Sequence, residues 1–96
     1  MVIKTQKGIA LYNWDNVMNI HLGSDGKTIQ IEQRNGQGGK LAYYRLDSWA
    51  IAALDMLFSA IRDGERAFEF PPESVMETVM VHRSHVKTKA TRHGGS

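Results

Sequence analysis

Two histidines near the C-terminus come nearest to a metal-binding motif in this sequence. On a helix, His82 and His85 would lie three positions apart on one face and could ligate one metal ion together. No third ligand stands at a matching spacing, and the chain has no cysteine, which excludes disulfides and cysteine-based zinc sites. We therefore predict solvated histidines, with no bound metal or other cofactor.

A cluster of three glycines within residues 35–39 invites comparison with a phosphate-binding loop. Such a loop lies between a strand and the N-terminus of a helix, where backbone amides and the helix dipole meet the phosphate. Here the cluster lies between two predicted strands and lacks the Gly-Lys-Ser/Thr ending. We predict a flexible hairpin turn instead of a nucleotide site.

Side chains that could form a catalytic pair are scarce. Asp63, Glu65 and Glu69 stand close together around a glycine turn, an arrangement typical of a solvated edge. His21 has no obvious serine or acidic partner, and no serine stands in the context of a nucleophile elbow. We predict that the protein is not an enzyme.

The basic residues are unevenly distributed along the chain. Residues 1–77 contain 8 Lys/Arg and 10 Asp/Glu, a net charge of −2, whereas residues 78–96 contain four cations and no acid. Such a stretch could neutralise nucleic-acid phosphates, although it offers no aromatic side chain for base stacking. Nucleic-acid association is therefore the alternative function, and its predicted contacts are Arg83, Lys87, Lys89 and Arg92.

The length of 96 residues indicates one domain. We place this domain at residues 1–81, followed by a basic, flexible tail at residues 82–96, because the tail lacks the apolar content needed for folding. The N-terminus lacks the apolar core of a signal peptide, and no apolar run approaches 18 residues. We expect a cytoplasmic protein without a membrane partner.

One long segment, about residues 48–63, has the apolar period of an amphipathic helix. Asp47 or Ser48 is the predicted N-cap, and Gly64 stands where a left-handed residue ends a helix. Spacings of three and four predict one face that packs on the core. That face contains Ala50, Ala53, Leu54, Leu57, Phe58 and Ile61.

The rest of the predicted domain shows mainly the pattern of strands and turns. Alternation predicts that Met18, Ile20 and Leu22 share one face of a strand. The following Asp25-Gly26 pair predicts a two-residue hairpin turn with positive φ at both positions. Residues 73–81 fit either a helix or a strand, and we favour a helix. The predicted strands are residues 2–6, 9–12, 17–22, 28–32, 41–46 and 66–70.

These elements predict an α+β fold in which a mainly antiparallel, four- or five-stranded curved sheet packs on the long helix. Without catalytic or cofactor motifs, we expect a protein–protein interaction module with the predicted partner-binding residues Trp14, Trp49 and Met56. Trp49 and Met56 flank the core face of the helix, and Trp14 stands at a corner of the chain, where it either caps the sheet or anchors an interface. This surface and an exposed sheet edge could also support a homodimer.

Several short motifs suggest a family resemblance. The corner Asn13-Trp14-Asp15-Asn16-Val17, the segment Tyr44-Arg45-Leu46-Asp47-Ser48 before the helix, and Phe68-Glu69-Phe70-Pro71 after it carry the resemblance. Over about residues 3–72, the chain resembles small uncharacterised single-domain proteins of Gram-positive bacteria and of their phages and mobile elements. The resemblance implies a pleckstrin-homology-like meander with one helix and no catalytic residue. It also implies that a phage-encoded chain of this kind could inhibit or modulate a host protein. Trp14 and the basic extension depart from the family pattern.

Overall fold

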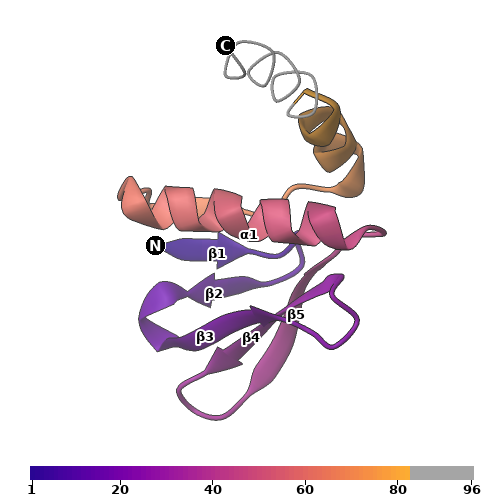
Figure 1. Ribbon diagram of the computed structural model, residues 1–96. Helices are drawn as coiled ribbons and strands as arrows, with labels where there is room; N and C mark the ends of the chain where they lie inside the picture. Colours follow the sequence, from indigo (N-terminus) through magenta and orange to yellow (C-terminus); the bar gives the residue numbers. More distant parts are fainter. Residues whose placement is uncertain (83–96) are drawn as a thin grey trace, which may run out of the picture.

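The computed structural model describes residues 1–82, which form two three-stranded sheets, one long helix and a second helix (Figure 1). A single 3₁₀ turn, η1, separates the second and third strands. In chain order the elements are β1 (Val2–Lys4), β2 (Leu11–Asn13), η1 (Trp14–Asn16), β3 (Val17–Leu22), β4 (Thr28–Gln33), β5 (Gly38–Tyr43), α1 (Asp47–Arg62), β6 (Ala67–Glu69) and a helix at residues 73–82.

The first sheet has the order β2-β1-β6, and the second is the meander β3-β4-β5. Strand β1 pairs antiparallel with β2 and parallel with β6, so Ile3 lies opposite both Tyr12 and Phe68. The predicted α+β class is confirmed, but the predicted single sheet of four or five strands on one long helix is wrong. Because η1 turns the chain between β2 and β3, these two strands do not pair, and β6 completes the first sheet instead.

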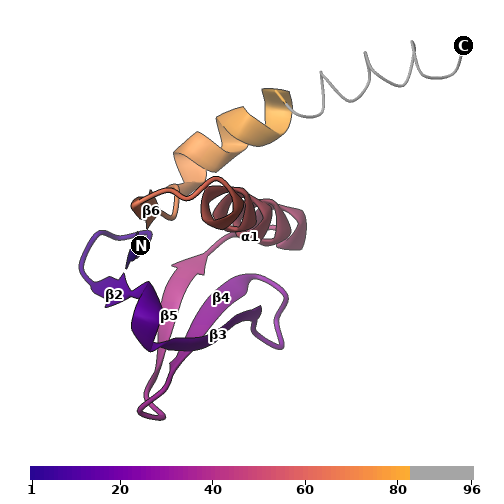
Figure 2. The ribbon, with the colours of Figure 1, turned by 90° about the vertical axis from the view of Figure 1, so that its left-hand side faces the viewer.

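Helix α1 lies across one side of the strands, as the two perpendicular views show (Figures 1 and 2). The core between helix and strands contains fully buried side chains from both sheets, from the segments that follow β5 and β6, and from the second helix. Burial of such side chains contributes about 1.5–3 kcal/mol each. The largest of them are Tyr44, Phe70, Ile3, Ile29, Ile31, Leu41 and Met76.

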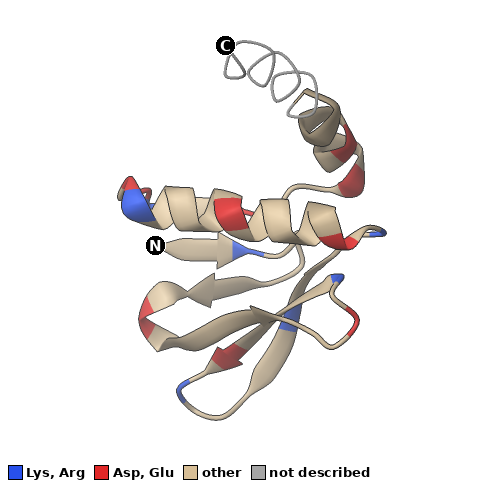
Figure 3. Cartoon of the chain, in the orientation of Figure 1, with Lys and Arg blue, Asp and Glu red and all other residues tan. Residues whose placement is uncertain are grey.

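The ends of α1 differ in how well the sequence predicted them. The N-cap is Leu46, which has no side-chain capping bond, and Asp47 lies in the first turn with Oδ1 accepting the N–H of Ser48 at 2.7 Å. The predicted N-caps are therefore wrong. Gly64 does adopt the left-handed conformation, with a φ of 72°, as expected after a helix. Asp47 at the start and Arg62 at the end also complement the helix dipole (Figure 3).

The buried side of α1 is rotated relative to the predicted core face. Phe58, predicted for the core, is 63% exposed, whereas Ala52, which lies outside the predicted face, is 3% exposed. The second helix contributes Met76 to the same core, so burial extends beyond the side of α1 that the sheets cover. The buried residues of α1 are Trp49, Ala50, Ala52, Ala53, Leu57 and Ala60.

The turn between β3 and β4 is longer than the predicted two-residue hairpin. Gly26 has a φ of 69°, but Asp25 does not adopt a positive φ. Asp25 instead uses Oδ1 to accept the N–H groups of Lys27 and Thr28, each at 2.9 Å.

A bulge between Val17 and Asn19 interrupts the alternation of β3. Met18 is consequently 60% exposed, whereas Ile20 and Leu22, predicted to share its face, are half-buried against the core.

Strand β5 begins at Gly38, three residues before the predicted strand, because the glycines themselves join the ladder: Gly39 pairs with Ile31 and Gly38 with Glu32. The prediction of a helix after Pro72 is confirmed, since residues 73–82 are helical. None of the helices within residues 1–82 is long and apolar enough to cross a membrane.

Candidate functional site

An open groove lies where the turn between β1 and β2 meets strand β5 and the start of the second helix. Its volume is about 640 Å³. Apolar and aromatic side chains line it together with a few polar groups, a composition typical of binding sites. The lining residues are Thr5, Gln6, Lys7, Ile9, Ala10, Tyr12, Lys40, Leu41, Ala42, Tyr43, Pro72 and Glu73.

Gln6 holds one end of the groove together. Its backbone N–H donates to the carbonyl of Leu41 at 2.9 Å, and its side-chain Oε1 accepts the N–H of Tyr43 at 2.8 Å. Its Nε2 also reaches the carbonyl of Pro71 at 3.4 Å. One residue therefore connects the end of β1 to the outer edge of β5 and to the segment before the second helix. These bonds fix the groove in the folded chain.

The turn beside the groove is held by Thr5. Its buried Oγ1 accepts the N–H groups of Ile9 and Ala10, each at 3.3 Å. Gly8 supports the turn with a φ of 71°. This arrangement presents Ile9 with 83% of its surface exposed, so a large aliphatic side chain stands in water at the rim of the groove.

Tyr12 and Gly39 bring β2 and β5 into contact beneath this rim. A Cβ atom built at Gly39 would lie 2.5 Å from the Tyr12 hydroxyl oxygen. Because real Cβ atoms do not approach so closely, the absence of a side chain at Gly39 allows Tyr12 to lie against β5. The wall of the groove thus depends on a glycine that belongs to the cluster at residues 35–39.

The charge in the groove is predominantly positive. Lys7 and Lys40 are exposed, and neither forms an ion pair with another described residue. The carboxylate of Glu73, in contrast, accepts the backbone N–H of Arg45. Two cations are therefore available to an acidic ligand, whereas the one acid is already engaged.

The three residues predicted to bind a partner do not form the most exposed surface. Trp49 is 7% exposed and lies beneath the guanidinium of Arg45, whose central carbon is 4.5 Å from the ring centroid. Trp14 and Met56 are half-buried and pack against the core. Little of the Trp49 side chain is therefore available to a partner.

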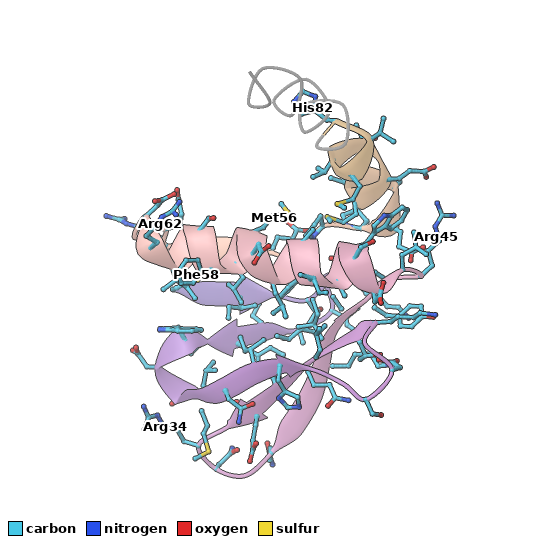
Figure 4. The ribbon with its side chains drawn as sticks, viewed as in Figure 1. Arg34, Arg45, Met56, Phe58, Arg62 and His82 are labelled. Carbon is cyan, nitrogen blue, oxygen red and sulfur yellow. The ribbon has the colours of Figure 1, made fainter. Side chains whose placement is uncertain are left out.

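Several exposed apolar residues were not predicted from the sequence as surface features. On α1, Ile51 is 49% exposed and Phe58 is 63% exposed. Figure 4 shows Phe58 at the edge of α1 nearer the strands and Met56 at the opposite edge. The signal for Phe58 was its neighbours, because Asp55 and Arg62 lie three and four positions away on the same helical face.

The two clearly shifted pKa values belong to groups with structural roles. Burial, with a contribution from the charge of Glu73, raises the pKa of Tyr44 well above its usual value. Hydrogen bonds from the Lys27 N–H and then from Thr28 lower the pKa of Asp25 to about 2. The first group stays protonated in the core, and the second stays ionised in a turn.

The described residues do not include a cluster of side chains that could bind a metal ion. Within residues 1–82, no three His, Asp or Glu side chains could hold a metal ion together. Of the glycine cluster, Gly36 lies in the turn between β4 and β5, whereas Gly38 and Gly39 begin β5, so the prediction of a turn holds for the first part of the cluster only. A strand follows this turn, where a phosphate loop would need a helix. The predicted tail residues lie outside the described part of the chain: His85, Arg83, Lys87, Lys89 and Arg92.

No protein-family model matches this chain, and the searches of curated proteins and of solved structures found no match either. The family resemblance over residues 3–72 therefore stays a prediction, as does the role in a phage or mobile element that it implied.

Proposed function

We propose that this protein is a non-enzymatic module that binds another protein, and that the groove receives an extended segment of that partner. The observation that carries the proposal is the exposure of Ile9, 83%, at the rim of a groove of about 640 Å³. Isolated aliphatic side chains are common on surfaces, but one beside a preformed groove is a candidate contact for a ligand.

The chemistry of the groove supports a segment that combines acidic and apolar residues. Tyr43, 46% exposed, offers an aromatic surface of the kind that is enriched at interfaces. Lys7 and Lys40 attract carboxylates and would favour their encounter with the groove. The bonds of Gln6 support a groove that is formed before binding, which lowers the entropic cost of association.

The roles of the ionisable groups support a function without catalysis. Asp25 is bonded within its turn and Tyr44 within the core. His21 contacts Asn19 at 2.7 Å on an exposed strand, without a serine or acid beside it among the described hydrogen bonds. We extend the proposal to modulation of a host protein by a phage-encoded chain, on the basis of the resemblance alone.

The test uses the full chain as bait for a displayed library of random ten-residue peptides. We expect enrichment of peptides that carry both acidic and apolar residues. Ile9→Ser and Tyr43→Ser should each weaken a selected peptide about 10-fold, a loss of about 1.4 kcal/mol. Lys7→Glu should also weaken binding of the peptide, and the loss of affinity should be larger at low salt than at high salt.

The matched control is Ile51→Ser, which removes an exposed isoleucine from α1, outside the groove. This variant should bind the selected peptides as the unmodified chain does. Failure to enrich any peptide, or equal binding by the Ile9 and Ile51 variants, would contradict the proposal. Circular dichroism of each variant separates lost binding from lost folding.

A further inference from the structure

Strand β3 forms the longest open edge of the two sheets. It contains six residues, whereas the edge strands β2 and β6 contain three each. The outer edge of β5 is partly occupied, because Gln6 bonds Leu41 and Tyr43 there. Strand β3 pairs only with β4 among the described residues, so no described strand uses the hydrogen-bonding groups of its opposite side.

The hydrogen-bonding pattern identifies the free groups of β3. The N–H of Gly23 donates to the carbonyl of Thr28 at 2.8 Å, which places this pair in the bonded register of the β3–β4 ladder. Bonded positions alternate along an antiparallel strand. The backbone N–H and C=O groups of His21 therefore also point toward β4. The N–H and C=O groups of Ile20 and Leu22 consequently point away from the sheet.

This edge lacks the features that usually prevent edge-to-edge pairing. Natural edge strands are short or carry charged residues or proline. Strand β3 contains no Lys, Arg, Asp, Glu or Pro, and Figure 3 shows no charged residue along it. By comparison, β6 is short, contains Glu69 and is followed by Pro71 and Pro72. The bulge after Val17 protects only the start of β3.

The sequence of β3 is complementary to itself. In an antiparallel pair with a two-fold axis at Ile20, the Ile20 residues of the two copies lie opposite each other. Asn19 of one copy then faces His21 of the other, and Met18, the extra residue of the bulge, comes near Leu22. Apolar residues meet apolar residues, an amide meets an imidazole, and no like charges oppose each other. This register also places the outward N–H and C=O groups of the two Ile20 residues in a bonded pair.

We propose that the chain forms a two-fold symmetric homodimer through antiparallel pairing of β3 with β3 of a second copy. The pairing would join the two meanders into one six-stranded sheet.

This dimer is independent of the proposed groove function. The groove includes β5, and β5 and β3 are opposite margins of the same sheet. Self-pairing would therefore leave both grooves of a dimer open, and two grooves would increase the avidity for a multivalent partner. Failure of one proposal would not affect the other.

The first test measures the mass of the full chain by sedimentation from about 1 to 100 μM. We expect a shift from one chain toward two across this range. Met18→Lys places a charge in the proposed interface and should weaken dimerisation at least 10-fold. Leu11→Lys is the matched control, since Leu11 is 67% exposed on the short edge strand β2, and it should dimerise normally. A chain that stays monomeric throughout, or equal effects of the two lysines, would overturn the proposal.

The second test examines the register by disulfide cross-linking. The chain has no native cysteine, so an introduced cysteine can link only to another introduced one. Asn19→Cys and His21→Cys are exposed positions, and opposite residues in a non-bonded antiparallel pair lie about 4.5 Å apart between Cα atoms, which suits a disulfide. When the two variants are mixed, the disulfide between an Asn19→Cys chain and a His21→Cys chain should form faster than the disulfide between two chains of the same variant. Equal rates would overturn the register centred on Ile20.

Discussion

The hydroxyl of Tyr44 donates a 2.7 Å hydrogen bond to the carbonyl oxygen of Pro71, in the buried interior of the protein. Tyr44 follows strand β5, and Pro71 precedes the second helix. The bond thus connects the meander to the segment that carries the second helix, at the end of the groove where Gln6 reaches the same carbonyl.

We predict that Tyr44→Phe destabilises the protein by about 1 kcal/mol, because it removes the hydroxyl and leaves a buried carbonyl with only the longer bond from Gln6. Urea denaturation should show a lower midpoint with an unchanged slope. Tyr43→Phe is the control: Tyr43 is 46% exposed, and its hydroxyl forms no hydrogen bond with the described residues. Equal midpoints for the two variants would contradict the assigned role of Tyr44.

Gly39→Ala should destabilise the protein by about 1 kcal/mol, at the low end of the cost of overpacking. The new Cβ would lie 2.5 Å from the Tyr12 hydroxyl and 3.4 Å from the ring carbon that carries it. Tyr12→Phe removes the clashing oxygen, so Gly39→Ala should cost less in that background. A double-mutant cycle measures this coupling. The explanation fails if the cost of Gly39→Ala is the same with tyrosine and phenylalanine at position 12.

Asp25 should make the stability of the protein depend on acid pH. Its pKa is lowered from 3.8 to about 2 in the folded chain, so the ionised carboxylate stabilises the fold. The stabilisation is fully present above about pH 4 and is lost as the pH falls through about 2. Asp25→Asn should therefore lower Tm at pH 6, and its difference from the unmodified chain should narrow between pH 4 and pH 2.

Thermal unfolding across pH 6 to 2 provides the measurement for Asp25. Asp55→Asn serves as the control, since Asp55 is exposed on α1 and forms no hydrogen bond among the described residues. A constant difference in Tm between Asp25→Asn and the unmodified chain over the whole range would show that the carboxylate charge does not stabilise the turn.

The groove could not be predicted from the sequence, because its residues come from distant parts of the chain. Ile9 and Lys7 belong to the first turn, Tyr43 and Lys40 to β5, and Glu73 to the second helix. No spacing along the chain relates these positions. The bonds of Gln6 to Leu41 and Tyr43 are similarly invisible in a pattern of apolar and polar residues.

The exposure of Phe58 and the burial of Trp49 have a related cause. Periodicity identifies helical faces, but it does not tell how many neighbours cover them. Both the strands and the second helix contribute to the core around α1, and Arg45 covers the Trp49 ring. The most apolar face of the isolated helix is therefore not its most buried face.

Local chemistry in the sequence sufficed for the existence of α1 and its end at Gly64, for β3, for the turn at the glycine cluster and for the second helix. Each of these depends on neighbouring residues, through apolar period, positive φ or the restriction imposed by proline. Tertiary structure alone decided that β6 pairs with β1, that the strands divide into two sheets, and that Gln6 closes the edge of β5 while β3 stays open. The strand pairings depend on hydrogen bonds between backbone groups, which nearly every residue carries and which residue type therefore does not reveal. The bond from the Tyr43 N–H to the Gln6 side chain joins residues 37 positions apart, a distance over which no local pattern relates them.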